Sequence, residues 1–144
     1  MGAMDFLRAS GKTAAVIVTH KRADLLQRSL HQVVHQTHPV DWVIVVDNGA
    51  ESVVRDMVAD YAGDRAVYVP SQTNLGGAGG FALGFLTALA KGADAIWCAD
   101  DDGCPADHGV LEELYRVAEK HQLAEVSPAV CNIDDPGRLA FPLR

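Results

Sequence analysis

Residues 95–103 read Ala95-Ile96-Trp97-Cys98-Ala99-Asp100-Asp101-Asp102-Gly103, an apolar run that passes directly into three acids and a glycine. A strand buried on both faces of a parallel sheet is apolar at nearly every position. In open sheets of this kind, ligands bind just beyond the carboxyl ends of the strands. The pattern therefore predicts a parallel strand with a ligand site at its acidic end.

The three adjacent acids favour a bound cation, because neighbouring carboxylates repel one another unless a positive charge lies between them. Hard oxygen ligands suit Mg²⁺ or Mn²⁺ that carries a substrate phosphate. Residues i and i+2 of an extended segment point the same way, so Asp100 and Asp102 are predicted to reach one cation while Asp101 faces elsewhere. The competing interpretation is a solvated acidic loop that caps the following helix.

The rest of the chain alternates between strand and helix patterns. Further strands are expected at residues 13–19, 42–46, 66–69 and 124–127, and helices at 24–36, 54–61, 81–89 and 107–122. This order predicts a Rossmann-like α/β fold, with a mostly parallel sheet of about five strands and helices on both faces. Residues 1–12 are interpreted as a tag or a poorly defined extension. Residues 13–144 are expected to form part of one domain that is cut inside a larger protein.

Composition excludes some classes of function. The chain has 144 residues, 49% of them hydrophobic, and a formal net charge of −7. Without a basic cluster, a nucleic-acid partner is not expected. The three cysteines, at positions 98, 104 and 131, form no metal-like pairs and indicate reduced thiols of a cytoplasmic protein. No segment is apolar enough for a membrane-spanning helix.

Two other strand ends carry polar side chains, at Thr19-His20-Lys21-Arg22 and Asp47-Asn48. Parallel strands bring these ends to one edge of the sheet, where they are expected to meet the acids after residue 99. Arg22 is suited to stacking on a base or pairing with phosphate, and Asp47 to accepting hydrogen bonds from a base or ribose. The alternatives are an exposed surface charge for Arg22 and a turn-forming role for Asp47.

A glycine-rich segment, residues 74–80, precedes the third expected helix. Gly77 to Ala82 fits the dinucleotide fingerprint G-x-G-x-x-A, with an acid about 20 residues later. That fingerprint belongs after a first strand, whereas this segment follows the third. Glycines also allow a nucleotide to approach the backbone at a helix N-terminus, where Asn74 can contribute its amide. Tight packing of the loop and helix is the structural alternative.

Taken together and in order, these motifs resemble the inverting glycosyltransferases of family 2, which have a GT-A fold. The resemblance rests on Val16-Ile17-Val18-Thr19-His20-Lys21-Arg22, Val45-Val46-Asp47-Asn48, Asn74-Leu75-Gly76-Gly77-Ala78-Gly79-Gly80 and Asp100-Asp101-Asp102. The segment from Leu123 to Arg144 is similar to the galactofuranosyltransferases that begin cell-wall galactan. The chain would then be the nucleotide-sugar-binding half of such a domain.

The resemblance implies a uridine-nucleotide site with assigned residues. Thr19 and Arg22 would line the uridine pocket, and Asp47 would hold the uracil. Asn74 and Gly77 would approach the ribose and the diphosphate. Many relatives have an asparagine where this chain has alanine at position 82, so one polar contact in the third helix is absent.

The same resemblance implies that Asp100 and Asp101 belong to the nucleotide site and that Asp100 and Asp102 bind the metal. The cofactor would be Mn²⁺ or Mg²⁺ bridging the diphosphate. The general base of the family is expected beyond residue 144, so no catalytic residue is nominated here. Asp134 and Asp135 are too early in the chain to match it.

The implied reaction transfers a sugar from UDP-galactofuranose to a polyprenyl-diphosphate-linked cell-wall glycan, and the chain alone is expected to transfer none. The expected location is the cytoplasm. Association with the inner face of the membrane through later residues, and formation of a homo-oligomer, stay open. Two other interpretations also stay open: a non-catalytic nucleotide-binding or assembly module that pairs through a sheet edge, and a nicotinamide-dinucleotide-binding domain.

Overall fold

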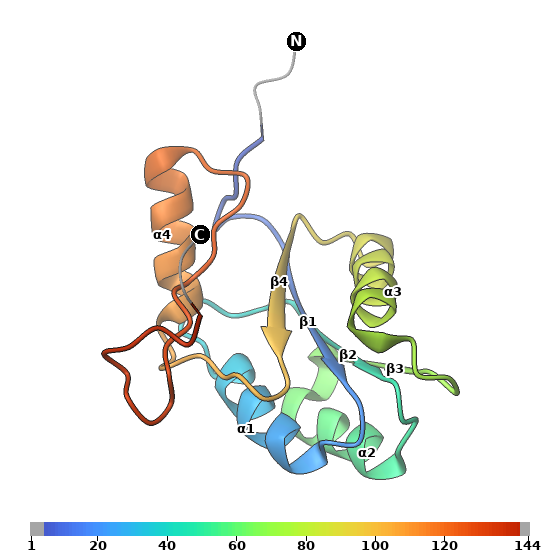
Figure 1. Cartoon of the computed structure of the whole chain (residues 1–144). Coiled ribbons are helices and arrows are strands. Elements are labelled where there is room, and N and C mark those ends of the chain that lie inside the picture. The colour runs from blue at the N-terminus through green and yellow to red at the C-terminus, as the bar shows by residue number, and fades with distance from the viewer. Residues whose placement is uncertain (1–4, 142–144) are drawn as a thin grey trace.

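The computed structural model describes residues 5–141 and contains one parallel four-stranded sheet (Figure 1). The strands are β1 (Thr13–Thr19), β2 (Trp42–Asp47), β3 (Ala66–Pro70) and β4 (Ala95–Asp100). Their spatial order is β3-β2-β1-β4, so the acidic strand β4 pairs directly with the first strand. This arrangement confirms the predicted parallel α/β fold and places β4 at an edge of the sheet.

The register of the sheet aligns the carboxyl ends of its strands. Thr19 at the end of β1 lies opposite Asp47 at the end of β2. On the other side of β1, Val18 lies opposite Asp100 at the end of β4. The polar residues after β1, β2 and β4 therefore meet at one edge, as the sequence predicted.

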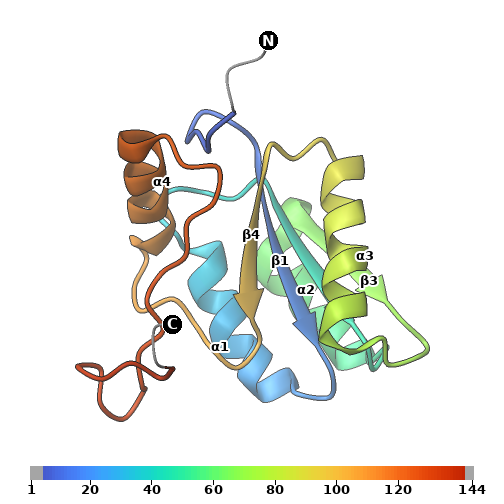
Figure 2. The same cartoon turned by 45° about the horizontal axis from the view of Figure 1, so that its top comes forward.

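Helices cover both faces of the sheet (Figure 2). They are α1 (Ala23–Val34), α2 (Ser52–Ala62), α3 (Gly76–Ala90) and α4 (Val110–His121), with a short 3-10 turn at Gly63–Arg65. Helices α1, α2 and α4 contribute to one hydrophobic cluster, and α3 contributes to the other. Among the described residues, no helix is long and apolar enough to cross a membrane.

Side chains of β1 alternate between these two clusters. Ala15 and Ile17 are fully buried among α1, α2 and α4, whereas Ala14 and Val16 are fully buried on the α3 side. Alternation along a strand sends successive side chains to opposite faces. A strand with a helix layer on each face must therefore be apolar throughout, which accounts for the continuous apolar run.

Helix α3 packs unusually close to the sheet because two of its buried residues are glycines. A Cβ on Gly80 would lie 2.5 Å from Cγ1 of Val18, and one on Gly84 would collide with Val16. Gly80 and Gly84 are four residues apart and so lie on the same face of the helix. Part of the glycine-rich segment therefore serves helix packing, the structural alternative considered above.

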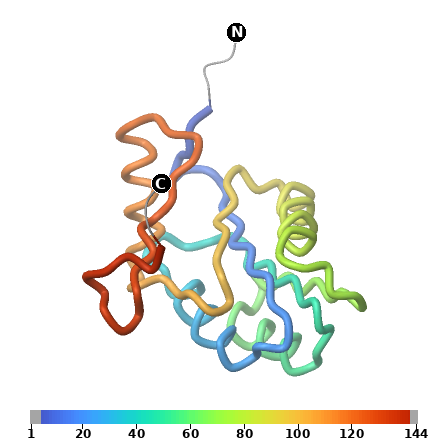
Figure 3. The backbone as a smooth tube through the Cα atoms, viewed as in Figure 1, coloured from blue at the N-terminus to red at the C-terminus, as the bar shows by residue number. Residues whose placement is uncertain are grey.

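The predicted fifth strand is absent from the described residues, and the sheet has four strands. Residues 124–130 run without regular structure, and the tail then forms an isolated antiparallel bridge between Cys131 and Leu139 (Figure 3). Pro128 directly follows this segment and has no N–H for a sheet ladder. Residues 124–127 therefore leave the edge of β4 unpaired.

The N-terminal extension is held against the domain more closely than the sequence suggested. The N–H of Leu7 donates to the carbonyl of Leu123 at 2.9 Å, and the N–H of Ala9 donates to Oε1 of Glu119 at 2.8 Å. Residues 5–12 thus pack along α4 and the segment after it. Residues 1–4 of the expected tag lie outside the described residues.

Candidate functional site

The loop after β1 is joined to the acids after β4 by a buried hydrogen bond. The hydroxyl Oγ1 of Thr19 donates to Oδ2 of Asp101 at 2.9 Å. Thr19 is 1% exposed and Asp101 is 8% exposed, so both residues are buried. The Asp101 carboxylate therefore connects two strand ends and faces the protein interior.

Arg22 supplies the positive charge for two of the acids. Its Nη1 lies 2.9 Å from Oδ2 of Asp102 and 3.5 Å from Oδ1 of Asp101. Strand β4 ends at Asp100, so the two-residue alternation used in the prediction does not extend to the residues that follow. As a result, Asp101 and Asp102 converge on one cationic group, and that group is Arg22.

Asp100 differs from its two neighbours. Its backbone carbonyl accepts a hydrogen bond from Oγ of Ser29 at 2.6 Å, which ties the end of β4 to α1. Partial burial, followed by the charges of Asp102 and Asp101, raises the pKa of the Asp100 carboxyl above its ordinary value. A nearby cation would relieve this repulsion.

Asp47 is fully buried at the end of β2, and its carboxylate builds the following turn. Oδ1 accepts from the N–H of Gly49 at 2.9 Å, and Oδ2 accepts from the N–H of Glu51 and the hydroxyl of Tyr68, both at 2.8 Å. The pKa of Tyr68 is raised to about 12 by burial, by its hydrogen bond to Asp47 and by the negative charge of Asp47. The predicted contact of Asp47 with uracil stays a prediction, and Oδ1, which accepts one of these three bonds, keeps a second acceptor site.

Asn48 is a site residue that the sequence reasoning quoted but did not nominate. It is 4% exposed, and its amide binds the loop before α3 through both of its polar atoms. Nδ2 donates to the carbonyl of Gly76, and Oδ1 accepts from the N–H of Leu75, both at 3.2 Å. The available signal was its position directly after Asp47, at the end of a buried strand.

The two site residues predicted in the glycine-rich segment are both at the surface, Asn74 in the loop before α3 and Gly77 in the first turn of that helix. Oδ1 of Asn74 accepts from the N–H of Gly76 at 2.9 Å, and Gly76 has a φ of +68° that favours glycine. Gly77 has open space where a Cβ would point. The start of α3 is therefore accessible to a ligand, while Asn48 holds its position relative to the sheet.

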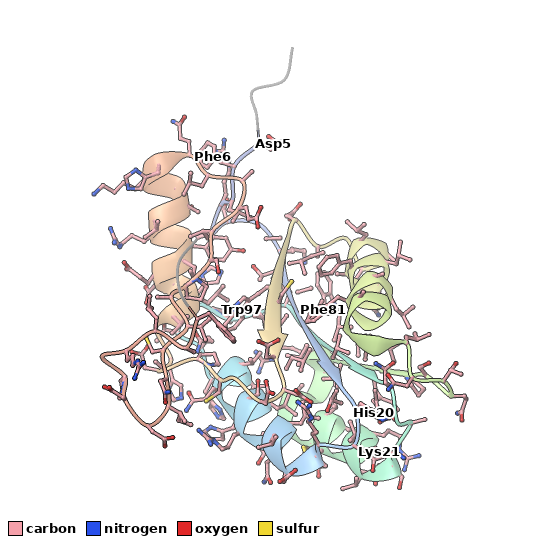
Figure 4. The ribbon with its side chains drawn as sticks, in the orientation of Figure 1. Asp5, Phe6, His20, Lys21, Phe81 and Trp97 are labelled. Carbon is pink, nitrogen blue, oxygen red and sulfur yellow. The ribbon has the colours of Figure 1, made fainter. Side chains whose placement is uncertain are left out.

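The two loops next to the site contain non-glycine residues in the left-handed region. Lys21, between β1 and α1, has a φ of +53°, and Ala50, between β2 and α2, has a φ of +49°. Figure 4 labels His20 and Lys21 in the first of these loops. Such backbone is disfavoured in ordinary residues and concentrates at functional sites.

The acids fit a metal that arrives with a phosphate better than a preformed metal cage. No group of three or more metal-binding side chains converges among residues 5–141. Asp100 and Asp102 nevertheless offer hard carboxylate oxygens at an exposed strand end. Mg²⁺ is commonly held by one or two carboxylates together with substrate phosphates, so this donor set fits such an ion.

The topology argues against a dinucleotide fingerprint. In that motif the glycine turn follows the first strand, at the point where the strand order reverses. Here β1 leads into Thr19-His20-Lys21-Arg22, which contains no glycine, and the glycine-rich segment follows the edge strand β3. Gly80 instead contacts Val18 of the sheet, so helix packing accounts for that glycine.

Comparison with known proteins agrees with this geometry. Residues 14–142 match the family model of glycosyl transferase family 2. The chain is 58% identical over 130 residues to the galactofuranosyltransferase GlfT1 of Mycolicibacterium smegmatis, and 58% identical over 132 residues to GlfT1 of Mycobacterium tuberculosis. Each match covers 90% of this chain and 43% of the relative, so the chain spans less than half the length of these relatives.

Solved glycosyltransferase structures share the fold. The complex of S. aureus TarS 1–349 with UDP aligns with a TM-score of 0.61 at 20% identity, covering 77% of this chain and 33% of that one. The mannosyltransferase PcManGT of Pyrobaculum calidifontis, in complex with GDP-Man and Mn²⁺, aligns with a TM-score of 0.60 at 20% identity, covering 87% and 37%. With a family match over nearly its whole length and this GT-A fold, the chain belongs to glycosyl transferase family 2.

Proposed function

We propose that this chain is the donor-binding part of a glycosyltransferase that uses UDP-galactofuranose and a divalent metal. The observation that carries the proposal is the convergence of three strand ends. Thr19 bonds to Asp101, Arg22 pairs with Asp102, and these contacts lie at the edge where Asp47 ends β2. At such an edge, a nucleotide base, a diphosphate and a metal can bind in adjacent positions.

The relatives support this choice of ligand. GlfT1 is named a galactofuranosyltransferase, TarS 1–349 was solved with UDP, and PcManGT was solved with GDP-Man and Mn²⁺. A likeness at 20% identity shows the fold, so the donor sugar rests on the 58% identity to GlfT1. A polyprenyl-diphosphate-linked acceptor, a cytoplasmic location and contact with the inner membrane face are part of the same proposal.

On the nucleotide side, Thr19 and Arg22 line the pocket beside β1. Asp47 holds the turn that borders the base, and Asn74 and Gly77 stand at the accessible start of α3. Backbone N–H groups at a helix N-terminus favour an anion, so this end of α3 suits the diphosphate.

On the metal side, Asp100 and Asp102 are the residues that would hold Mn²⁺ or Mg²⁺, and Asp101 supports them from the interior. The bound ion would neutralise the charge that develops on the departing UDP. The protein orients the acids for this task through Ser29 and Thr19. We assign acceptor activation to a base outside these residues, because Asp134 and Asp135 are too early in the chain to match the base that the family resemblance implies.

The direct test is calorimetric titration of UDP into the chain with and without Mn²⁺. We expect binding that requires the metal and that the Asp102→Asn variant loses. The matched control is Asp60→Asn, which removes the same charge from an exposed position on α2. Metal-independent binding, or equal affinity in the Asp102→Asn variant, would contradict the proposal. A parallel titration with NADH tests the nicotinamide interpretation, and we expect no binding.

A further inference from the structure

We infer that Arg22 is the resident counter-ion of Asp102, that it competes with the metal for this carboxylate, and that it passes to the nucleotide diphosphate when the metal binds. This inference rests on the proposed function, since it concerns the same site. The starting observation is the 2.9 Å ion pair between Arg22 Nη1 and Asp102 Oδ2.

The two acids that Arg22 contacts differ in their freedom to change partners. The Asp101 side chain is 10% exposed, and it already accepts the Thr19 hydroxyl, so it is fixed in the protein. The Asp102 side chain is 54% exposed, and its described partner is Arg22. Exposed ion pairs contribute little to stability, so exchange of Arg22 for another cation at Asp102 is energetically easy.

Arg22 is anchored at its backbone but free at its guanidinium. Arg22 is the N-cap residue directly before α1, and its carbonyl accepts from the N–H of Leu26 at 2.9 Å. Its side chain is 52% exposed. The guanidinium can therefore change partner without any change in the fold.

Competition between Arg22 and the metal follows from charge. An arginine does not lose its proton in proteins, so a dication at Asp102 would face an undiminished positive charge at the same carboxylate. Repulsion between the two cations would therefore favour release of the guanidinium from Asp102 when the metal binds. The planar donor fork of the guanidinium matches phosphate oxygens, and the proposed diphosphate lies beside the metal.

The consequence is coupled binding of metal and nucleotide. Without UDP, the metal has to displace Arg22 to solvent, whereas with UDP the displaced guanidinium gains a new anionic partner. UDP should then raise the affinity for Mn²⁺, and Mn²⁺ should raise the affinity for UDP by the same factor. Direct contact between the metal and the phosphate would contribute one part of this factor, and the change of partner by Arg22 would contribute another.

The test measures Mn²⁺ affinity by electron paramagnetic resonance of the free ion, with and without UDP. We expect Arg22→Gln to bind Mn²⁺ about two- to fivefold more tightly than the unmodified chain when UDP is absent. The same variant should show a smaller enhancement by UDP. Lys21→Gln removes an equal charge one residue away and so controls for long-range electrostatics. It should change both the Mn²⁺ affinity and the enhancement by UDP less than Arg22→Gln does.

Two further variants and a folding check complete the design. The gain in Arg22→Gln should disappear in the Arg22→Gln/Asp102→Asn double variant, and Arg22→Lys should restore part of the coupling. Thermal unfolding confirms that each variant is folded. Equal Mn²⁺ affinities in Arg22→Gln and Lys21→Gln, or no Mn²⁺ binding by Arg22→Gln, would overturn the inference. Tighter, Asp102-dependent Mn²⁺ binding without any UDP binding would uphold the competition at Asp102, but it would overturn the transfer of Arg22 to the diphosphate together with the proposed function.

Discussion

Oγ1 of Thr19 donates a hydrogen bond to Oδ2 of Asp101 at 2.9 Å, and this bond joins the ends of β1 and β4 below the candidate site. Both residues are buried, so loss of the donor would leave a buried carboxylate oxygen unpaired. We expect Thr19→Val to lower the free energy of unfolding by about 1.5–3 kcal/mol, the range for hydrogen bonds to charged groups. Urea unfolding followed by circular dichroism measures this change.

The control for that substitution is Thr87→Val on α3. The Thr87 hydroxyl donates to the Leu83 carbonyl within the same helix, so its loss leaves no buried charge unpaired. Thr19→Ser should recover most of the lost stability because it restores the hydroxyl. Equal losses of unfolding free energy in Thr19→Val and Thr87→Val would show that the Thr19–Asp101 hydrogen bond contributes no more to stability than a hydrogen bond within a helix.

Gly80→Ala should destabilise the domain. The added Cβ would lie 2.5 Å from Cγ1 and 3.1 Å from Cγ2 of Val18, so α3 would have to move away from the sheet. Overpacking of this kind costs about 1–3 kcal/mol. Gly77→Ala, in the same helix, meets open space and should be neutral or stabilising by up to about 1 kcal/mol. Thermal unfolding measures the stability of both variants. A Gly80→Ala variant as stable as the unmodified chain would contradict the close packing of α3 on the sheet.

Stability should fall at alkaline pH because of Tyr68. Its pKa is raised to about 12, chiefly by burial and then by the hydrogen bond to Asp47. The folded chain therefore holds the phenol proton more tightly than the unfolded chain, in which tyrosine titrates near about 10. The resulting stability is complete below about pH 10 and is lost as the pH rises through about 12.

The measurement compares urea unfolding of the unmodified chain and Tyr68→Phe between about pH 8 and about pH 11.5. The unmodified chain should be more stable at pH 8, and the difference should narrow toward the upper end of the range. Tyr61→Phe removes a surface hydroxyl that accepts from Gln27, and it controls for loss of a phenol elsewhere. A difference that stays constant with pH would refute the prediction.

Gln36 should determine how firmly α4 is attached. It is 6% exposed, its Nε2 donates to the Asp107 carbonyl at 2.8 Å, and its Oε1 accepts from the N–H of Leu111 at 2.9 Å. Gln36→Met leaves both backbone groups unpaired and should cost about 1–3 kcal/mol. Hydrogen exchange at the Leu111 amide should accelerate in this variant.

Gln32→Met provides the matched comparison one turn earlier in α1. Its Oε1 is buried without a hydrogen-bond partner in the described part of the chain. Replacement by a thioether of similar shape removes an unsatisfied polar atom and should be neutral or stabilising. Slow exchange at Leu111 in both variants would mean that Gln36 does not hold α4.

Much of the fold follows from local pattern. The continuous apolar runs indicated strands buried on both faces, and the alternating helices implied parallel pairing. Burial on both faces is correct for β1 and β2 but wrong for β4, an edge strand whose Cys98 is exposed. The pattern at residues 124–127 did not form a strand, because a strand requires a partner edge as well as apolar residues. Whether such an edge is used also depends on the surrounding chain, and here Pro128, directly after this segment, has no N–H for a sheet ladder.

The site was less predictable than the fold. Period-two alternation suggested that Asp100 and Asp102 would share a metal cation, and this stays a prediction. It did not indicate that β4 ends at Asp100 or that Asp101 and Asp102 both pair with Arg22. Nothing local to Asn48 shows that its amide holds the loop before α3, since its partners are 27 and 28 residues away.

By itself, the sequence indicated the four strands and four helices of the described residues, and which strand ends carry acids, because side-chain periodicity and turn chemistry are local. It also predicted a strand at residues 124–127 that does not form. Only the tertiary structure decided which of those acids are held in the interior, which of them face solvent, and which positive group pairs with Asp101 and Asp102. Those properties depend on burial and on contacts between β1, α1 and β4. Packing brings these elements together, although the paired residues Arg22 and Asp102 are 80 positions apart in the chain.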